Sequence, residues 1–341
     1  MSEQLSNLEV ESIPTIDLSR EAWLEARKAG LGGSDAGAIL GLNPWKTAAD
    51  VWLVKTGREP DAEDNDAMYW GRRLEDLVAD EYGVRTGRRV QRHNFMRRVG
   101  CMVANLDRLV VPDDGTVASY RGEVRTTRAL EVKTARDSGL WADGLPAWYE
   151  AQVMHYMALH PTIQFIDVPV LFLSERKFEV FSVARRDDLI ASLVEREFAW
   201  WQEHIVGGLP PDPQNEADCR SLWRRHHPGK SVQAGIDVER AIVALREAKA
   251  AAKAAEAAEE EARFLVEACM QDAETLVDVL GRPLATWKAN KDGSVTDWEA
   301  VARAAGATDE LIAQHTTPKA GARVLRLAKV KGEETKKGEV A

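Results

Sequence analysis

The sequence predicts an α/β fold in which a central mixed sheet is flanked by helices, followed by a long helix and a small α+β C-terminal region. Three observations support this prediction. Apolar residues have helical spacing up to residue 86, the segments between residues 89 and 134 have extended character, and residues 236–277 contain no Gly or Pro. The length of 341 residues agrees with about two domains.

The first part of the chain contains four predicted helices. Ser19 is expected to cap a helix over 19–29, and Ser34 is expected to cap a short helix after a glycine-rich turn. A third helix is expected over 47–57. The fourth, over 66–86, is long and amphipathic because its apolar residues recur every three or four positions.

Extended segments follow, separated by glycine and proline. We predict strands over 89–98, 101–111 and 117–134, with breaks at Gly100 and at residues 112–115. The rest of this domain is expected to be a helix over 146–159, strands over 165–173 and 177–183, and a closing helix over 187–206.

Composition indicates the domain boundaries. Three prolines between residues 210 and 213 mark the end of the first domain, and the Ala- and Glu-rich run beyond them would form a helix of about 60 Å. We therefore expect an extension over 1–18, the main domain over 19–209, a linker over 210–232, the long helix over 233–278, a small α+β region over 279–330 with strands at 281–289 and 323–327, and a disordered tail over 331–341.

The formal net charge of −10, taken alone, argues against a nucleic-acid partner. The charge is unevenly distributed, however. Residues 72–108 contain nine arginines against five acidic residues, and residues 121–136 contain five basic against two acidic residues. A protein with an acidic exterior and a basic cleft still attracts a polyanion to that cleft.

Cysteine content and hydropathy exclude several classes of protein. Three widely spaced cysteines exclude a disulfide scaffold, a CxxC zinc module and a four-cysteine iron–sulfur site, and they are typical of a reducing cytoplasm. No apolar run approaches the roughly 20 residues of a membrane span, and the polar N-terminus is unlike a signal peptide. We therefore expect a cytoplasmic protein without a membrane partner.

The most informative segment is 129–134, where Glu131 and Lys133 lie two residues apart on a predicted strand. Side chains alternate along a strand, so both should project from one face. A carboxylate that holds Mg²⁺, beside a lysine that stabilises charge, suits the hydrolysis of a phosphodiester. Taken alone, this triplet is more often a surface ion pair.

Two further carboxylates make the catalytic interpretation stronger. Asp107 lies in a predicted strand 24 residues before Glu131, a gap that fits a neighbouring strand, and Glu75 lies on the long amphipathic helix. Mg²⁺ prefers oxygen ligands in octahedral geometry, and these three residues would supply them. Each acid taken singly is more often an ordinary surface, turn or strand residue.

A helical Glu, a strand Asp and E-x-K in this order resemble the PD-(D/E)XK nuclease superfamily. The wider pattern is similar to its YqaJ-type viral recombinase branch, the lambda exonuclease-like group. The resemblance covers roughly residues 20–206, and its segments are 30–35 with 43–45, 70–75, 130–134 and 146–157.

The resemblance implies a metal site. Its ligands would be Glu75, Asp107, Glu131 and the backbone carbonyl of Val132, with Lys133 as the catalytic lysine. The cofactor would be Mg²⁺, with Mn²⁺ as a substitute. Residues 95–98 provide no additional acid of the kind found in the lambda enzyme, which leaves open whether one or two metal ions bind.

The resemblance also implies roles for a helix and a pocket. Gln152 and Tyr156 match a catalytic Q-x-x-x-Y motif, and His155 between them would contact substrate. Arg27 and Ser34 have the spacing of a pair that grips a 5′-terminal phosphate. The alternative is that Ser34 is a plain helix cap and Arg27 a surface residue. Trp148, after the E-x-K strand, is a candidate for stacking on bases.

These expectations together describe a Mg²⁺-dependent exonuclease of phage recombination that resects double-stranded DNA from 5′ ends and leaves 3′ overhangs. The alternatives are an endonuclease or structure-specific nuclease on the same core, and an inactive DNA-binding recombination scaffold. The resemblance implies double-stranded DNA ends and a single-strand annealing protein as partners. It also implies a homo-oligomer, with a trimer as the analogous arrangement, in the cytoplasm of a bacterial host.

Overall fold

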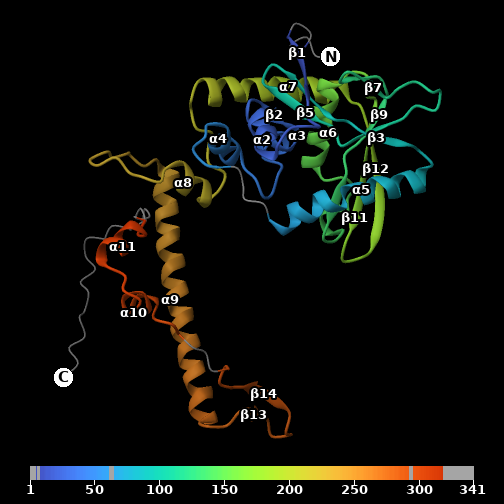
Figure 1. Ribbon diagram of the computed structural model, residues 1–341. Helices are drawn as coiled ribbons and strands as arrows, with labels where there is room; N and C mark the ends of the chain where they lie inside the picture. Colours follow the sequence, from blue (N-terminus) through green and yellow to red (C-terminus); the bar gives the residue numbers. More distant parts are fainter. Residues whose placement is uncertain (1–4, 6–7, 61–64, 292–294, 318–341) are drawn as a thin grey trace. The chain divides into compact units, whose positions relative to one another are not determined.

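The computed structural model describes residues 5, 8–60, 65–291 and 295–317 (Figure 1). The chain divides into two compact units, Met1–Trp223 and Arg224–Ala341. The first unit contains the predicted main domain and is built from two sheets and the helices packed against them.

Four helices lie between residues 20 and 86 in the described part of the first unit, as the sequence predicts. Ser19 caps the first of them, because its side chain accepts from the N–H of Ala22 at 3.2 Å. The predicted cap at Ser34 is wrong: the second helix begins at Gly33, and Asp35 Oδ2 accepts from the N–H of Gly32 at 3.0 Å. The four helices are α2 (Arg20–Lys28), α3 (Gly33–Ile39), α4 (Ala48–Lys55) and α5 (Asp66–Thr86).

The strands form two main sheets. The first has the order β1-β4-β5-β2 and the second the order β10-β11-β9-β6-β3, with β12 also paired to β11, while β7 and β8 form a separate hairpin. The strands are β1 (Val10–Pro14), β2 (Leu31–Gly32), β3 (Val90–Arg92), β4 (Phe95–Val99), β5 (Met102–Asn105), β6 (Arg108–Val110), β7 (Ser119–Tyr120), β8 (Glu123–Val124), β9 (Arg128–Leu130), β10 (Lys133–Ala135), β11 (Phe165–Phe172) and β12 (Lys177–Ala184).

The strand expected over 101–111 is interrupted at Leu106 and Asp107. At this point the chain leaves β5 in the first sheet and enters β6 in the second. Asp107 therefore lies at the junction of the two sheets.

Helices cover both faces of the second sheet. The even-numbered residues of β11, from Ile166 to Phe172, lie in the main core with α6 (Ala147–Leu159). Leu171 packs instead into a cluster with Val78 of α5. Because side chains alternate along a strand, α6 and α5 lie on opposite faces. This arrangement confirms the predicted mixed sheet flanked by helices.

The E-x-K segment runs parallel to β11 and is split into β9 and β10. The register on either side of the split places Pro169 opposite Val132. Proline has no N–H to donate, so one rung of the ladder is lost here. The N–H of Val132 donates to Asp107 Oδ2 at 2.8 Å, outside the ladder with β11.

Parts of the segments expected to be an extension and a linker form regular structure in the first unit, namely residues 10–14 and 216–222, whereas residues 224–232 belong to the second unit. Strand β1 pairs antiparallel with β4. Helix α7 (Asp187–Trp200) continues into the π-helical turn η2 (Trp201–Val206), and α8 (Glu216–Leu222) follows. The hydroxyl of Thr47 donates to the buried carboxylate of Asp218 at 2.9 Å, which attaches α8 to the start of α4.

The second unit contains α9 (Ile236–Met270), the hairpin β13 (Thr275–Val277) and β14 (Pro283–Thr286), and the short helices α10 (Trp298–Ala304) and α11 (Asp309–Gln314). Helix α9 ends earlier than predicted, because Gln271 has a positive φ of 49° and Thr275–Val277 pair with β14. The strand expected at 323–327 and the tail at 331–341 lie outside the described residues. None of the helices in the described ranges is long and apolar enough to span a bilayer.

Candidate active site

Glu131 and Lys133 project from one face of the second sheet, as alternation predicts. Lys133 Nζ donates to Glu131 Oε1 at 2.5 Å, and Gln152 Nε2 of α6 donates to the same oxygen at 2.6 Å. Glu131 is 4% exposed, and its other oxygen, Oε2, is buried without a hydrogen-bond partner in the described part of the chain. A buried carboxylate oxygen without a donor is a group that a cation would satisfy.

Asp107 lies next to this pair at the junction of the two sheets. Its Oδ2 accepts from the N–H of Val132, the residue between Glu131 and Lys133. Burial, together with the negative charges of Glu131 and Glu75, raises the pKa of Asp107 well above its usual range. The carboxylates of Asp107 and Glu131 therefore repel one another in the absence of a compensating cation.

Glu75 does not join this cluster. Its carboxylate accepts from Arg108 Nη1 at 2.6 Å, and the same nitrogen donates to the backbone carbonyl of Asp107 at 2.7 Å. Glu75 comes from α5, which covers the face of the sheet opposite the Glu131 side chain. Within the described residues, accordingly, no group of three or more His, Cys, Asp or Glu is arranged to hold a metal. Glu75 is paired with Arg108, and its place in the predicted three-carboxylate ligand set stays a prediction.

Asp107 and Glu131 nevertheless fit Mg²⁺ in their chemistry. Both supply hard oxygen donors, and one oxygen of Glu131 is buried and unpartnered. The backbone of Val132 lies beside Asp107 through its N–H. The roles of its carbonyl and of Glu75 as ligands stay predictions.

Lys133 is held in its protonated form beside the acids. Burial alone would lower its pKa, but Glu131, Tyr149 and Asp107 raise the pKa above its ordinary value. The ammonium also lies 4.8 Å from the centre of the Tyr149 ring. This is the charged state that a lysine needs to stabilise a developing negative charge.

Gln152 and Tyr156 meet on one face of α6, as their spacing predicts. Gln152 Nε2 donates to the Tyr156 hydroxyl at 2.9 Å as well as to Glu131. Burial, and then the charges of Glu131 and Asp107, raise the pKa of Tyr156 well above its usual value, so its hydroxyl stays protonated. The structure thus brings together five predicted residues, namely Asp107, Glu131, Lys133, Gln152 and Tyr156.

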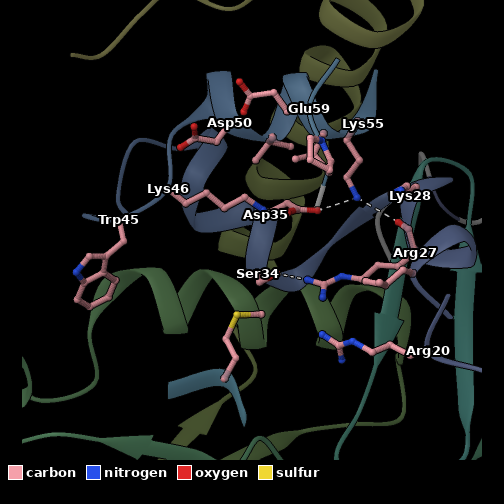
Figure 2. A pocket seen from close by; sticks show the side chains of 15 residues that line it. Arg20, Arg27, Lys28, Ser34, Asp35, Trp45, Lys46, Asp50, Lys55 and Glu59 are labelled. Carbon is pink, nitrogen blue, oxygen red and sulfur yellow. Dashed lines mark hydrogen bonds and ion pairs between the residues drawn. The ribbon is translucent and has the colours of Figure 1, made fainter. Parts of the chain in front are cut away.

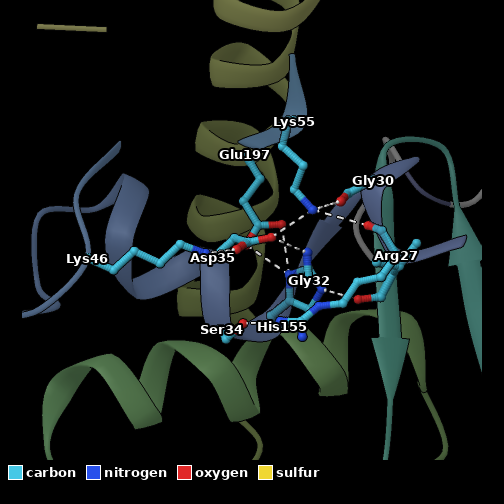
Figure 3. Close-up of polar contacts among 10 residues, drawn as sticks. Arg27, Gly30, Gly32, Ser34, Asp35, Lys46, Lys55, His155 and Glu197 are labelled. Carbon is cyan, nitrogen blue, oxygen red and sulfur yellow. Dashed lines mark hydrogen bonds and ion pairs between the residues drawn. The ribbon is translucent and has the colours of Figure 1, made fainter. Parts of the chain in front are cut away.

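His155 was predicted to contact substrate, and this prediction is wrong, because its side chain has no exposed surface. One ring nitrogen bonds the Glu197 carboxylate of α7 at 2.9 Å and the other bonds the carbonyl of Val103 in β5 at 2.9 Å (Figure 3). Burial alone would lower the pKa of His155, but Glu197 raises it. His155 therefore ties α6 to α7 and β5.

Arg27 and Ser34 line a pocket of about 560 Å³ between α2, α3 and α4 (Figure 2). Arg27 Nη2 donates to the hydroxyl of Ser34. The pocket is lined by five basic and three acidic residues. The structure thus brings the predicted phosphate-binding pair together in a basic cavity.

Trp148 lies at the start of α6, half-buried against α3. Its ring packs edge-to-face on Trp45, with centroids 5.4 Å apart, and Trp45 is 66% exposed. The role of Trp148 in stacking on bases stays a prediction.

Sequence reasoning missed three residues of the pocket, namely Asp35, Lys46 and Lys55. Asp35 directly follows Ser34 in the glycine-rich segment, where an acid at the third position of a helix commonly serves as a cap. The two lysines carry no local signal, because only the packing of α3 against α4 brings them to the carboxylate. Arg108 was counted as part of the basic segment but not as the partner of Glu75.

A family model described as the YqaJ-like viral recombinase domain matches residues 22–161. Uncharacterized protein YqaJ of Bacillus subtilis strain 168 is 33% identical over 227 residues, which cover 65% of this chain and 68% of that protein. Among solved structures, the alkaline exonuclease LHK-Exo of Laribacter hongkongensis is 19% identical, with a TM-score of 0.41, covering 55% of this chain and 93% of that chain. A phage-related exonuclease from Haemophilus somnus 129PT is 13% identical, with a TM-score of 0.40, covering 53% of this chain and 96% of that chain.

Proposed function

The chain belongs to the YqaJ-like viral recombinase family, and from this premise we propose that it is a Mg²⁺-dependent exonuclease that degrades linear double-stranded DNA from 5′ ends and leaves 3′ overhangs. The observation that carries the proposal is the buried, unpartnered Oε2 of Glu131 beside Asp107, with Lys133 at 2.5 Å from the other oxygen of Glu131.

Asp107 and Glu131 are the proposed metal ligands, with the Val132 carbonyl and Glu75 as additional ones. Bound Mg²⁺ supplies charge stabilisation for a phosphodiester and makes water a better nucleophile. Mn²⁺ is expected to substitute. Glu75 is paired with Arg108 through Oε1, and its other carboxylate oxygen would be the one offered to the metal.

The side chains around the carboxylates have separate tasks in this proposal. Lys133, protonated and mostly buried, stabilises negative charge on the attacked phosphate. Gln152 holds the Glu131 carboxylate in place through Oε1 and leaves Oε2 free. The Tyr156 hydroxyl accepts a second hydrogen bond from Gln152 Nε2. The two hydrogen bonds together fix the orientation of the Gln152 amide.

The pocket around Arg27 and Ser34 is the proposed anchor for the terminal 5′ phosphate. A terminal monoester carries more negative charge than an internal diester, and a guanidinium provides planar donors for it. Anchoring an end would explain how a chain of net charge −10 engages DNA without broad non-specific affinity.

The test uses full-length protein, Mg²⁺ and a linear duplex in which each strand carries a distinguishable label. Glu131→Gln and Lys133→Ala are expected to lower the rate of nucleotide release at least about 100-fold. The matched controls are Lys177→Ala and Glu179→Gln on β12, an ion pair at 2.6 Å with the same two-residue spacing and greater exposure. These variants should retain wild-type activity.

The outcomes separate the alternatives. Early release of label from 5′ ends, with 3′-terminated single strands left behind, is the expected pattern. Cleavage of closed circular DNA would favour an endonuclease on the same core. Full activity in both active-site variants would contradict the site, and DNA binding without any hydrolysis would favour a recombination scaffold.

The same family membership leads us to propose two assembly properties. The 3′ strand that such an enzyme exposes would be passed to a single-strand annealing protein. The chain itself would form a homo-oligomer, with a trimer as the expected state. Light scattering of the full chain measures the second property directly.

A further inference from the structure

Lys133 is held by an aromatic ring as well as by Glu131. Its Nζ donates to Glu131 Oε1 at 2.5 Å and lies over the face of the Tyr149 ring, 4.8 Å from its centre. An ammonium in this place is attracted by the electron-rich face of the ring, and the attraction is stronger away from water. The Lys133 side chain is only 17% exposed. The ring therefore makes a second contact that localises the ammonium.

The Tyr149 ring is itself fixed, because it is stacked on Trp141. The two ring centroids are 5.2 Å apart and the planes differ by 28°. Trp141 is 6% exposed and also contacts two rings of the second sheet, Phe172 of β11 and Phe181 of β12, with centroids 5.7 and 5.5 Å away. An indole anchored in the main core thus sets the position of the Tyr149 ring.

The loop that carries Trp141 is attached to the sheet by hydrogen bonds. Trp141 ends the short 3₁₀ helix η1 (Gly139–Trp141), which follows the E-x-K segment. Glu175, in the turn between β11 and β12, accepts from the N–H of Ser138 at 2.7 Å and from its hydroxyl at 2.8 Å. These two hydrogen bonds fix the start of η1, so the place of Trp141 does not depend on ring packing alone.

Tyr149 lies on the face of α6 that also holds Glu131. It precedes Gln152 by three residues and Tyr156 by seven, which is the spacing of a single helix face. Gln152 contacts the carboxylate of the E-x-K segment, and Tyr149 contacts its lysine. One face of α6 therefore positions both charged groups of the segment.

The two contacts of Lys133 respond differently to a bound cation. Glu131 is a proposed metal ligand, and a cation on its carboxylate would weaken its attraction for the ammonium. The Tyr149 ring is neutral, so its attraction does not depend on the cation. Within the described residues Glu131 Oε1 is the one hydrogen-bond acceptor of Lys133 Nζ, which leaves N–H groups for a phosphate oxygen.

We propose that Tyr149 is a positioning residue for Lys133 and that Trp141 orients its ring, so that the aromatic pair keeps the ammonium aligned with the attacked phosphate. This inference rests on the proposed function and adds two aromatic side chains to its site. Tyr149 acts through Lys133, and the group that acts is the face of its ring rather than its hydroxyl.

The first measurement requires no activity. The full chain is labelled with ¹³C at the ε-carbons of lysine, spectra are recorded in EDTA, and the Lys133 signal is identified by its disappearance in Lys133→Arg. The ring current of Tyr149 should shift the ε-protons of Lys133 upfield of those of exposed lysines. Tyr149→Phe should keep this shift, and Tyr149→Leu should abolish it.

The second measurement is nucleotide release from linear duplex DNA with Mg²⁺. Tyr149→Phe should keep kcat within about twofold of wild type, because the ring face is retained. Pentafluorophenylalanine at position 149 has a similar shape but a reversed charge distribution on the ring. It should lower kcat at least about tenfold and change KM less than about twofold, and Tyr149→Leu should behave alike.

The matched control is a cation over a ring elsewhere on the same sheet. The Arg128 guanidinium lies 4.4 Å from the centre of the Phe165 ring. Phe165→Leu removes that contact and should change neither kcat nor the Lys133 signal. The pentafluorophenylalanine chain keeps a ring of similar size in place, so the comparison with Tyr149→Phe holds even where Tyr149→Leu does not fold.

Three results would overturn the inference. They are an unshifted Lys133 signal in the wild type, equal kcat for the phenylalanine and pentafluorophenylalanine chains, and a loss in Tyr149→Phe as large as in Tyr149→Leu, which would assign the role to the hydroxyl. Failure of the proposed function is distinct from these, because a chain that hydrolyses no DNA still shows in EDTA whether the ring holds the ammonium.

Discussion

At the scale of single residues, two buried histidines lie near one another outside the candidate site. His93 and His160 are 4% and 1% exposed, with ring centroids 5.9 Å apart. In the described part of the structure none of their four ring nitrogens has a hydrogen-bond partner. Burial, and then the charge of Arg97, lowers the pKa of His93 from 6.5 to about 4, and the pKa of His160 is lowered as well.

This arrangement predicts a loss of stability in mild acid. As the pH falls below 6.5 the unfolded chain takes up a proton at His93, whereas the folded chain does so only near pH 4. Between pH 7 and pH 5, His93 alone should lower the free energy of unfolding by about 2 kcal/mol. His93→Leu should reduce the difference between urea denaturation curves at these two pH values.

The exposed His227 provides the control, since His227→Gln should keep the wild-type pH dependence. An equal pH dependence in His93→Leu and wild type would show that His93 is protonated to the same extent in both states. His93→Leu also removes two buried ring nitrogens that have no hydrogen-bond partner in the described residues. The free energy of unfolding of this variant at pH 7 should therefore fall less than when a hydrogen-bonded polar side chain is removed.

At the scale of elements, the contact between α3 and α6 depends on two glycines one turn apart. A Cβ on Gly33 would lie 2.6 Å from Tyr156 Cε1, and a Cβ on Gly37 would lie 2.7 Å from Trp148 Cβ. Only glycine allows this approach. Helix α3, which helps to line the pocket around Arg27 and Ser34, is therefore in direct contact with α6, the helix that carries Gln152.

Gly37→Ala is expected to lower the free energy of unfolding by about 1–3 kcal/mol, because α3 must move away from α6. Gly71 of α5 is the matched control: it is also helical, and a Cβ there would meet Thr134 Oγ1 at an ordinary 3.7 Å. Gly71→Ala should be neutral or stabilise by up to about 1 kcal/mol. Similar urea midpoints for the two variants would contradict the packing account.

Elements with strong local signals could be predicted from the sequence, and elements defined by long-range pairing could not. Helix α5 has the predicted bounds because Asn65 caps its start and Gly87, with φ of 71°, ends it. The division of residues 101–111 between two sheets has no local signal, since β5 and β6 differ only in their distant partners.

The same limit applies to the candidate site. Alternation along the strand correctly placed Glu131 and Lys133 on one face, and helical spacing correctly paired Gln152 with Tyr156. The burial of His155 depends on Glu197, 42 residues away, and the orientation of Glu75 depends on Arg108. Neither contact could be inferred from spacing within one element.

At the scale of the whole molecule, the first unit extends to Trp223 rather than to the prolines near residue 210. Helix α8 is held by the buried carboxylate of Asp218, which accepts from Thr47 Oγ1 and from the N–H of Gln214 at 2.8 Å. Removal of α8 would leave the hydroxyl at the start of α4 without this partner.

A chain of residues 1–223 is therefore expected to unfold in a single cooperative transition. A chain ending at residue 209 should be less stable by about 1–3 kcal/mol, because a buried hydrogen bond to a carboxylate is lost. Urea denaturation of the two truncated chains measures the difference. Equal midpoints would mean that α8 adds nothing to the unit.

Asp107 lies in the two-residue connection between β5 and β6, and this position decides when the carboxylate cluster can form during folding. Its backbone is set by β5 on one side and β6 on the other, while its partner Val132 is set by the pairing of β9 and β10 with β11. The carboxylate cluster therefore depends on the pairing of strands that lie far apart in the sequence, and Asp107 meets Val132 only after β6, β9, β10 and β11 have joined in one sheet.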